Sequence, residues 1–322
     1  MRGYTSTSQA LLTAQTPVAE RVAAVIVTYK RPEMFSRTLE SCLSQSDALH
    51  VVVVDNTPAG EGDYVKERID HMNMAKDRIT CLRPGKNLGG AGGFALGMQS
   101  AYERGFVWLW VMDDDVVPLP GALAALLAHG SAARCVYPAK LCADGRLFAF
   151  EGRISRRTLW RTRVHTMQSS WGEIEVNSGN FEGAFIHREV IDKIGLPEAG
   201  FFLTWDDTLF GMRAAEYFRC IYITTICMQK QLDKERLKLC GKAMLSSTIF
   251  TRYYFFRNYC FVMSYLDKSG DLCPLAYVLY GILLTKALLI TAIVDRSCSG
   301  IVKVMKGSWY GLLGRQIAYE DA

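Results

Sequence analysis

Residues 22–58, VAAVIVTYKRPEMFSRTLESCLSQSDALHVVVVDNTP, decide the fold class of this chain. The continuous apolar run from Val22 to Thr28 predicts a strand that is buried on both faces, as in parallel sheets. Pro32 then opens an amphipathic helix, and a second buried strand follows from His50 to Val54. Strand, helix and strand within about 35 residues form one right-handed βαβ unit.

The same alternation continues along the chain. We expect further strands at 79–82, 106–112 and 135–139, and helices at 89–102, 119–129, 189–194 and 207–218. This order predicts an α/β fold with an open, mainly parallel sheet that binds ligands at the carboxyl ends of its strands. We expect an N-terminal extension at 1–20, which lacks the apolar segment of a signal peptide, a catalytic domain at 21–230, and a helical region at 231–322.

Composition excludes several classes of protein. The 322 residues carry 37 basic and 32 acidic side chains, a net charge of +5, without a dense basic stripe that would bind nucleic acid. The mild excess suits phosphates or an anionic membrane surface. None of the ten cysteines forms a CxxC pair, so we expect reduced thiols and no zinc site or disulfide framework.

The C-terminal region is expected to associate with a membrane. The stretch from Leu272 to Val294 carries only one charge, Lys286, and is long enough to span a bilayer. Because Pro274 and the central lysine weaken that reading, a transmembrane, an interfacial and a core helix all stay open. Basic residues of the kind that headgroups attract follow beside Trp309 and Tyr310, namely Arg296, Lys303, Lys306 and Arg315.

Three consecutive carboxylates end the apolar segment 106–112, FVWLWVM. Clustered like charges need a compensating cation. Alternate residues of an extended chain point the same way, so Asp113 and Asp115 could share one ion. Hard oxygen ligands favour Mg²⁺ or Mn²⁺, which donor phosphates would also hold.

Two further segments carry candidate binding residues. Residues 87–94, NLGGAGGF, place four glycines in five positions at the start of a helix, where backbone can approach a ligand. Trp205, Asp206 and Asp207 follow an aromatic run and begin another helix. Either carboxylate could merely cap that helix. An indole beside two carboxylates is also suited to stack on a sugar while one carboxylate accepts a hydroxyl proton.

Taken together, these segments resemble the family 2 glycosyltransferases, in particular the bacterial cell-envelope galactofuranosyltransferases. The resemblance runs from Val25 to about Arg315 and implies a GT-A fold with an appended helical region. The motifs that carry it are VIVTYKRP at 25–32, NLGGAGGFALGM at 87–98, WVMDDDV at 110–116, FFLTWDDTLFGMRAAE at 201–216, RYYFFRN at 252–258 and KGSWYGLLGR at 306–315.

The resemblance implies a role for each candidate residue. Asp113 and Asp115 would hold Mn²⁺ or Mg²⁺, Asp207 would be the general base, and Trp205 and Asp206 would shape the acceptor site. The residues expected at the nucleotide-sugar are Thr28, Arg31, Asp55, Asn87, Gly89, Gly90 and Asp114.

One position departs from the family pattern. The family usually places a metal-binding histidine after the helix that begins at the WDD motif. In this chain the matching stretch is 226–230, ICMQK, and Gln229 stands where the histidine would be. A glutamine carbonyl oxygen can ligate a hard cation, so Gln229 is expected to be the third metal ligand.

The expected activity is inverting transfer of galactofuranose from UDP-galactofuranose to a polyprenyl-diphosphate-linked saccharide, in the synthesis of cell-envelope polysaccharide such as cell wall or O-antigen. The enzyme would work in the cytoplasm, attached peripherally to the inner face of the plasma membrane. A dTDP-rhamnose-dependent transferase is an alternative, since such enzymes resemble the chain at 113–115 and 252–258. A non-catalytic scaffold protein is another. A Rossmann-type dehydrogenase is rejected because the first strand is not followed by GxGxxG.

Overall fold

The computed structural model describes residues 21–71, 76–148, 150–166, 172–232, 236–239, 242–245 and 247–321. The N-terminal extension expected at 1–20 lies outside the described residues.

A ten-stranded sheet forms the centre of the catalytic part of the chain, and its main strands follow the order β10-β12-β6-β11-β4-β1-β2-β3. The strands β1 to β4 pair in parallel, as the βαβ pattern predicts. Strand β11 runs antiparallel to both of its neighbours, β4 and β6, so the sheet is mixed at its centre. The bounds are β1 (Val22–Thr28), β2 (His50–Asp55), β3 (Ile79–Leu82), β4 (Trp108–Asp113), β6 (Cys135–Leu141), β10 (Glu173–Glu175), β11 (Ala184–His187) and β12 (Cys220–Lys230).

Short strands complete the mouth of the sheet. β5 (Val116–Pro118) pairs with the end of β12, and β7 (Leu147–Phe148) pairs with β6. β8 (Gly152–Ile154) and β9 (Arg161–Arg163) form a separate antiparallel hairpin. Three 3₁₀ turns are present in the described part of the chain, η2 (Lys76–Arg78), η3 (Val164–Thr166) and η4 (Ala199–Phe201).

Helices cover both faces of the sheet, which explains why the strand sequences are apolar at successive positions. Ile26 and Val53 belong to one hydrophobic core, whereas Val25 and Val52 belong to the other, because successive side chains point to opposite faces. The first core is closed by α1 (Pro32–Leu43), α2 (Tyr64–His71) and α4 (Ala122–Ala128). The second is closed by α3 (Gly89–Glu103), α5 (Arg188–Ile194) and α6 (Asp206–Ala214).

The glycine-rich start of α3 lets this helix lie very close to the sheet. A Cβ atom on Gly93 would stand 2.6 Å from Val27 Cγ1, a separation that real Cβ atoms do not adopt. Part of the glycine block therefore serves helix–sheet packing, a reason that the sequence reading did not give.

The C-terminal region is only partly helical. Two short paired strands, β13 (Arg236–Leu239) and β14 (Lys242–Leu245), lie in this region, so the expectation of helix from 231 onward is wrong there. The sequence RLKL alternates charged and apolar residues with the period of a strand. Helices follow from residue 249, namely α7 (Ile249–Lys268), α8 (Pro274–Ile293) and α9 (Cys298–Leu312).

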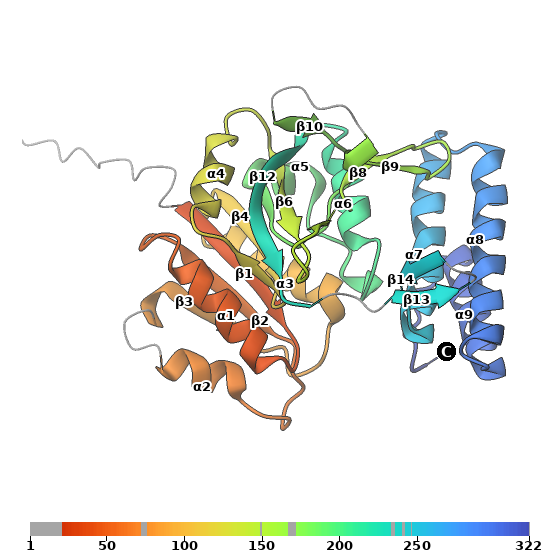
Figure 1. Cartoon of the computed structure of the whole chain (residues 1–322), viewed down its shortest axis with the longest axis horizontal. Coiled ribbons are helices and arrows are strands. Elements are labelled where there is room, and N and C mark those ends of the chain that lie inside the picture. Colours follow the sequence, from red (N-terminus) through yellow and green to blue (C-terminus); the bar gives the residue numbers. More distant parts are fainter. Residues whose placement is uncertain are drawn as a thin grey trace, which may run out of the picture.

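These three helices stand together at one end of the molecule, beside the sheet and its covering helices (Figure 1). A third hydrophobic core joins the two parts. Tyr259 and Val262 of α7 belong to it together with Phe201 and Leu209, which lie on either side of the WDD motif. The helical region is thus packed directly against the segment that carries the candidate catalytic carboxylates.

Candidate active site

A cavity of about 640 Å³ opens at the carboxyl end of β4. Of the residues expected in the site, it brings together Gly90, Asp113, Trp205, Asp206 and Asp207. Eight other expected residues do not line this cavity: Thr28, Arg31, Asp55, Asn87, Gly89, Asp114, Asp115 and Gln229.

Asp114 ties the end of β1 to the end of β4. Its carboxylate is buried and accepts a hydrogen bond of 2.8 Å from the Thr28 hydroxyl and one of 3.1 Å from Arg31. The Tyr29 amide donates a further bond of 3.3 Å. Three of the expected donor-site residues therefore contact one another, with the Asp114 carboxylate already bonded within the protein.

Asp115 offers an oxygen without a partner, and Asp113 lies among other negative charges. One oxygen of Asp115 accepts from Arg31 at 3.1 Å, but its Oδ1 is buried without a hydrogen-bond partner. Burial raises the pKa of Asp113 well above its usual range, and the charges of Asp115 and Glu182 add to this. A divalent cation would relieve both the orphaned oxygen and the crowding of charge, so the two carboxylates fit the metal that the resemblance implies.

A cluster of three acidic, histidine or cysteine side chains is not found in the described part of the chain, so the expected third ligand, Gln229, stays a prediction. Strand β12 pairs with β5 so that Lys230 lies opposite Val116, directly after the aspartates. Lys230 donates to Glu182 at 2.5 Å. Gln229 pairs with Val117 of β5 and with Leu141 of β6 in the register of the sheet.

Asp206 and Asp207 occupy the first turn of α6 at the cavity, where Asp206 is buried and Asp207 is partly exposed. Burial, with a contribution from the charge of Asp207, raises the pKa of Asp206 to about 8. Burial also raises the pKa of Asp207, but only to about 6, because Arg161 and a hydrogen bond from the Thr208 amide oppose it. Near neutral pH Asp207 is therefore the ionised carboxylate of the pair.

The loop before α6 has an unusual backbone. Phe202, Thr204 and Trp205 all have positive φ angles, of 60°, 67° and 69°, which are costly for residues with side chains. The Trp205 indole packs edge-on against Tyr259 of α7, with ring centroids 4.9 Å apart. Its Nε1 is buried and has no hydrogen-bond partner in the protein. A buried donor of this kind at a cavity wall is available to a ligand oxygen.

Two neighbouring side chains of α7 hold this strained loop in place. The Asn258 amide nitrogen lies 2.9 Å from the carbonyl oxygens of Phe201, Leu203 and Thr204. Arg257 donates to the carbonyl of Phe201 at 2.9 Å and to the Asn258 side chain at the same distance. Arg257 and Asn258 of the RYYFFRN motif thus position the WDD segment, and Phe255 of the same motif lines the cavity.

The glycine block contacts the same loop. Gly89 has a φ of +70°, and a Cβ atom there would lie 2.1 Å from the carbonyl oxygen of Phe202. The Asn87 side chain accepts a bond of 2.9 Å from the Gly89 amide, which fixes the turn into α3. Gly90 differs, since it lines the cavity and a Cβ atom there would have open space around it. Gly89 therefore faces the WDD loop and Gly90 faces the cavity.

Asp55 lies at the end of β2, paired with Thr28 in the register of the sheet. Its buried carboxylate lies 3.1 Å from the Arg83 guanidinium and accepts a bond of 3.0 Å from the Thr57 amide. It belongs to the same sheet edge as the aspartate cluster, and β1 lies between the two strands that carry them.

Several residues of the site were missed in the sequence. Glu182 lines the cavity just before β11, and its charge acts on both Asp113 and Asp207. Arg161 lies over the ring of Phe150 at 4.0 Å and also lines the cavity. The basic stretch RISRRTLWRTR at 153–163 was the available signal, but its strands have only three residues each and gave no clear pattern.

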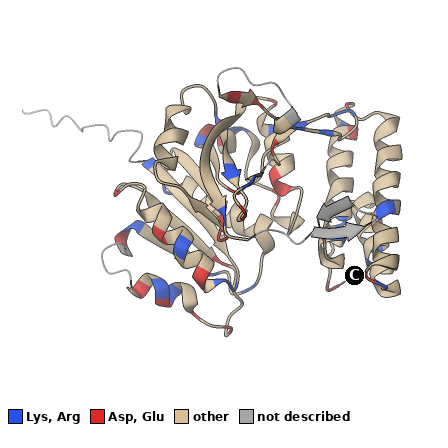
Figure 2. Ribbon diagram, viewed as in Figure 1, with Lys and Arg blue, Asp and Glu red and all other residues tan. Residues whose placement is uncertain are grey.

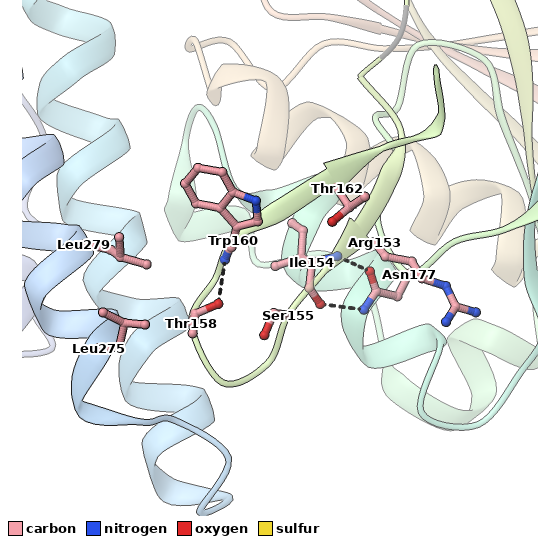
Figure 3. Close-up of a pocket in the computed structure, with 9 residues that line it drawn as sticks. All are labelled: Arg153, Ile154, Ser155, Thr158, Trp160, Thr162, Asn177, Leu275 and Leu279. Carbon is pink, nitrogen blue, oxygen red and sulfur yellow. Dashed lines mark hydrogen bonds between the residues drawn. The ribbon is translucent and has the colours of Figure 1, made fainter. Parts of the chain in front are cut away.

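A second hollow, of about 650 Å³, lies between the β8–β9 hairpin and α8. Figure 3 shows Trp160 at the hairpin facing the side of α8 that carries Leu275 and Leu279. Trp160 and Ile154 line both hollows, so the second one is adjacent to the cavity.

Comparison with known proteins agrees with this architecture. Residues 23–195 match the sequence model of the family described as "Glycosyl transferase family 2". The chain is 32% identical over 197 residues to the galactofuranosyltransferase GlfT1 of Mycolicibacterium smegmatis, and equally to that of Mycobacterium tuberculosis H37Rv. The matched region covers 58–59% of this chain and 63% of each relative, so it spans less than two thirds of their length.

Solved structures share the fold at low sequence identity. GalNAc-T7, crystallised with UDP, GalNAc and Mn²⁺, superposes with a TM-score of 0.57 at 15% identity, covering 76% of this chain and 47% of that one. Residues 1–349 of S. aureus TarS superpose with a TM-score of 0.54 at 10% identity, covering 91% and 81%. The same TarS fragment in complex with UDP superposes with a TM-score of 0.52 at 12% identity, covering 76% of this chain and 65% of that one. This chain belongs to glycosyl transferase family 2, and its sheet and covering helices form a GT-A glycosyltransferase fold.

Proposed function

We propose that the protein is an inverting glycosyltransferase that moves galactofuranose from UDP-galactofuranose to a lipid-linked saccharide. The observation that carries this proposal is the single cavity that holds both Asp113, at the end of β4, and Asp207, at the start of α6. Asp113 suits the metal that would hold the donor diphosphate, and Asp207 suits the base that would act on the acceptor. The mycobacterial relatives named as galactofuranosyltransferases support the choice of sugar.

The reaction would be a single displacement. Asp207 accepts the proton of an acceptor hydroxyl, whose oxygen bonds to the anomeric carbon as the bond from that carbon to the diphosphate breaks. The leaving diphosphate keeps the electron pair, and the anomeric configuration inverts. Trp205 would stack on the acceptor sugar, and Asp206, which holds a proton near neutral pH, would donate a hydrogen bond to it.

Donor binding would use the edge of the sheet where β1, β2 and β4 end. Asp113 and Asp115 would hold Mn²⁺ or Mg²⁺, which when bound offsets the charge that develops on the leaving diphosphate. Thr28, Arg31 and Asp55 would lie near the nucleotide. Four further residues would complete this site, namely Asn87, Gly89, Gly90 and Asp114. Gly90 would let the backbone approach the donor directly, and the other three would fix the backbone of the site.

We further propose that α8 attaches the protein to a membrane, where the lipid-linked acceptor resides. This helix is long and apolar enough to cross a bilayer by length and composition. Ala276, Tyr280 and Ala287 are buried, whereas Ile282 and Leu289 are 60% and 55% exposed. Figure 2 shows that α8 carries very little charge along its length. One packed face and one exposed apolar face favour a helix that lies in the membrane surface over a helix that spans the bilayer.

The position of α8 relative to the cavity supports a polyprenyl-diphosphate-linked acceptor. Leu283 of α8 lines the cavity, and Leu275 and Leu279 line the adjacent hollow. A membrane-bound substrate could therefore reach Asp207 along the same helix that contacts the lipid. We place this membrane surface at the cytoplasmic face, where nucleotide sugars are found.

The nucleotide preference can be tested by thermal unfolding of the purified protein with UDP or dTDP, each with Mn²⁺, Mg²⁺ or EDTA. A ligand that binds only the folded state raises Tm. We expect UDP to raise Tm, most strongly with Mn²⁺, and dTDP to have little effect. A shift with dTDP alone would indicate a rhamnosyltransferase. No shift with either nucleotide would indicate a non-catalytic relative and contradict the proposal.

A further inference from the structure

An exposed tryptophan stands where the cavity and the second hollow meet. Trp160 is 63% exposed, and it lines both the catalytic cavity and the hollow between the β8–β9 hairpin and α8. Within the described part of the chain, its indole stacks on no other ring and donates no hydrogen bond. Tryptophan side chains are mostly buried in folded proteins, so one that is left open beside a cavity is suited to cover the apolar face of a ligand.

The turn of the hairpin separates Trp160 from its neighbour Leu159. Leu159 is 6% exposed and belongs to the third hydrophobic core, and its φ angle is +57°. The Leu159 amide donates to the carbonyl oxygen of Ser155 at 2.8 Å, and the Ser155 amide donates to that of Trp160 at 2.9 Å. A positive φ is costly for leucine. The strained turn buries the leucine and leaves the indole in the open hollow.

The hairpin is bonded to the elements on both sides of it. Arg161 follows Trp160 and donates to the Thr208 hydroxyl at 3.1 Å. Thr208 is itself the residue after Asp207. At the turn, the carbonyl oxygen of Arg157 accepts a hydrogen bond of 2.9 Å from the residue just before α8. The tryptophan is therefore held between the candidate base and the start of α8.

The walls of the hollow differ in chemistry. The hairpin side carries the hydroxyls of Ser155 and Thr162, which have no hydrogen-bond partner among the described residues. The other wall carries Leu275 and Leu279 of α8, which Trp160 faces (Figure 3). A sugar ring offers one apolar face to an indole and hydroxyls to polar side chains, whereas a hydrocarbon chain would leave the hydroxyls that it covers unpaired. The hairpin side of the hollow therefore suits a sugar better than a lipid chain.

We propose that this hollow binds the second sugar of the acceptor, counted from the sugar whose hydroxyl reacts, and that Trp160 is the surface on which the second sugar stacks. The inference rests on the proposed function, because it takes Asp207 as the place of the reacting sugar. Asp207 and Trp160 line the same cavity, so two linked sugars can occupy the two positions together. The acceptor continues from there past Leu275 and Leu279 toward its lipid. The enzyme thus selects acceptors that already carry at least two sugars.

Octyl glycosides that carry one or two galactofuranose residues test this inference. Calorimetry on the full chain, with UDP and Mn²⁺ present, measures the affinity for each glycoside. We expect the wild type to bind the two-sugar glycoside about tenfold more tightly, the contribution expected of an aromatic ring that covers a ligand. In Trp160→Ala this difference should disappear, while the affinity for the one-sugar glycoside stays the same. Because Trp160 is exposed, its removal leaves the hydrophobic cores intact.

Two further variants complete the test. Trp160→Phe keeps an aromatic ring and should retain most of the difference between the glycosides. Tyr217→Ala removes an exposed aromatic residue outside the hollow and should change neither affinity. Equal binding of the two glycosides by the wild type, or a difference that survives in Trp160→Ala, would overturn the inference.

The lipid is the other occupant that the test separates. If Trp160→Ala weakens binding according to the length of the alkyl chain instead of the number of sugars, the hollow holds the lipid and the inference is wrong. Transfer of galactofuranose to a lipid-linked saccharide is measured separately. Equal binding of the two glycosides by a protein that performs this transfer therefore overturns the inference and leaves the proposed function standing.

Discussion

Asp206 and Asp207 are adjacent in the chain, yet their surroundings give them different protonation states. Asp206 is buried and Asp207 is half-buried, and the Arg161 guanidinium and the Thr208 amide stabilise the ionised form of Asp207. Asp206 has no comparable cation and carries the higher pKa. Pairs of carboxyl groups whose surroundings separate their pKa values can divide the work of base and hydrogen-bond donor.

The role of Asp207 can be tested by Asp207→Asn, which keeps the shape of the side chain and removes the base. We expect kcat to fall about 10²- to 10⁴-fold, the usual contribution of a positioned base. UDP affinity should stay within about twofold, because the substituted group serves the acceptor. Asp267→Asn, at an exposed carboxylate of α7, is the control and should be active. Lost UDP binding with retained turnover would contradict the assignment.

The pH dependence of transfer follows from the same carboxylate. The base must be ionised, and burial raises the pKa of Asp207 to about 6. Activity should therefore be constant between that pH and about 8, where Asp206 loses its proton, and fall about tenfold per pH unit below pH 6. Initial rates at saturating donor give this profile when they are measured from about pH 5 to about pH 8, a range that brackets the expected pKa. A rate that stays flat to pH 5 would show that another group accepts the proton.

The site was less predictable from sequence than its motifs suggested. The acidic cluster and the WDD motif were visible because several functional residues are adjacent in the chain. Glu182 and Arg161 could not be found in this way, since each reaches the cavity from a short strand or its flank through tertiary packing. Lys230 follows directly after Gln229, and its contact with Glu182 becomes visible only in the folded chain.

At the scale of elements, the start of α3 and the loop before α6 form one unit. The Ala91 amide donates to the carbonyl oxygen of Phe202 at 3.2 Å, and Gly89 leaves room for that carbonyl. Asn258 of α7 holds the other side of the same loop. The glycine block, the WDD motif and the RYYFFRN motif are therefore coupled by direct contact.

Two alanine substitutions separate packing from cavity lining in the glycine block. Gly89→Ala should destabilise the fold by about 2 kcal/mol, because it combines a strained backbone with overpacking against Phe202. Gly90→Ala, which meets no atom within 4 Å, should change the free energy of unfolding by less than about 1 kcal/mol. Urea unfolding of both variants measures these values. Equal destabilisation by the two would show that the contact with Phe202 is unimportant.

Elements with a strong repeating pattern were predicted well, and short or atypical ones were not. The strand at Val22–Thr28 and the helix from Gly89 match the structure because continuous apolar runs and glycine-opened helices are strong signals. The antiparallel β11 was missed, since four apolar residues between turns carry no sign of strand direction. Strand β12 was missed because TTICMQ mixes polar and apolar residues and contains register shifts in its pairing with β6.

At the scale of the whole molecule, the helical region both supports the site and presents an apolar surface. Arg257 and Asn258 face inward and hold the WDD loop, whereas one side of α8 is exposed. Arg252 joins α7 to the end of α8 by contacts with Thr291 and Asp295. Attachment to a membrane through α8 would therefore place the catalytic cavity at a fixed distance from the lipid.

The double variant Ile282→Asp/Leu289→Asp tests membrane attachment. Binding to vesicles of anionic phospholipid should fall at least about tenfold, because each buried aliphatic side chain contributes about 1.5–3 kcal/mol. Sedimentation with the vesicles measures the bound fraction. Tyr217→Asp, at an exposed aromatic residue outside α8, should leave binding unchanged. Equal losses in both variants would mean that α8 is not the contact surface.

The most direct test of the whole account is a transfer assay with purified protein, Mn²⁺ and a polyprenyl-diphosphate-linked saccharide, offering UDP-galactofuranose and dTDP-rhamnose in separate reactions. The account predicts that galactofuranose is added with inversion at the anomeric carbon, that rhamnose is not added, and that Asp207→Asn lowers the rate at least about 100-fold. Transfer of rhamnose alone, retention of configuration, or full activity of Asp207→Asn would contradict it.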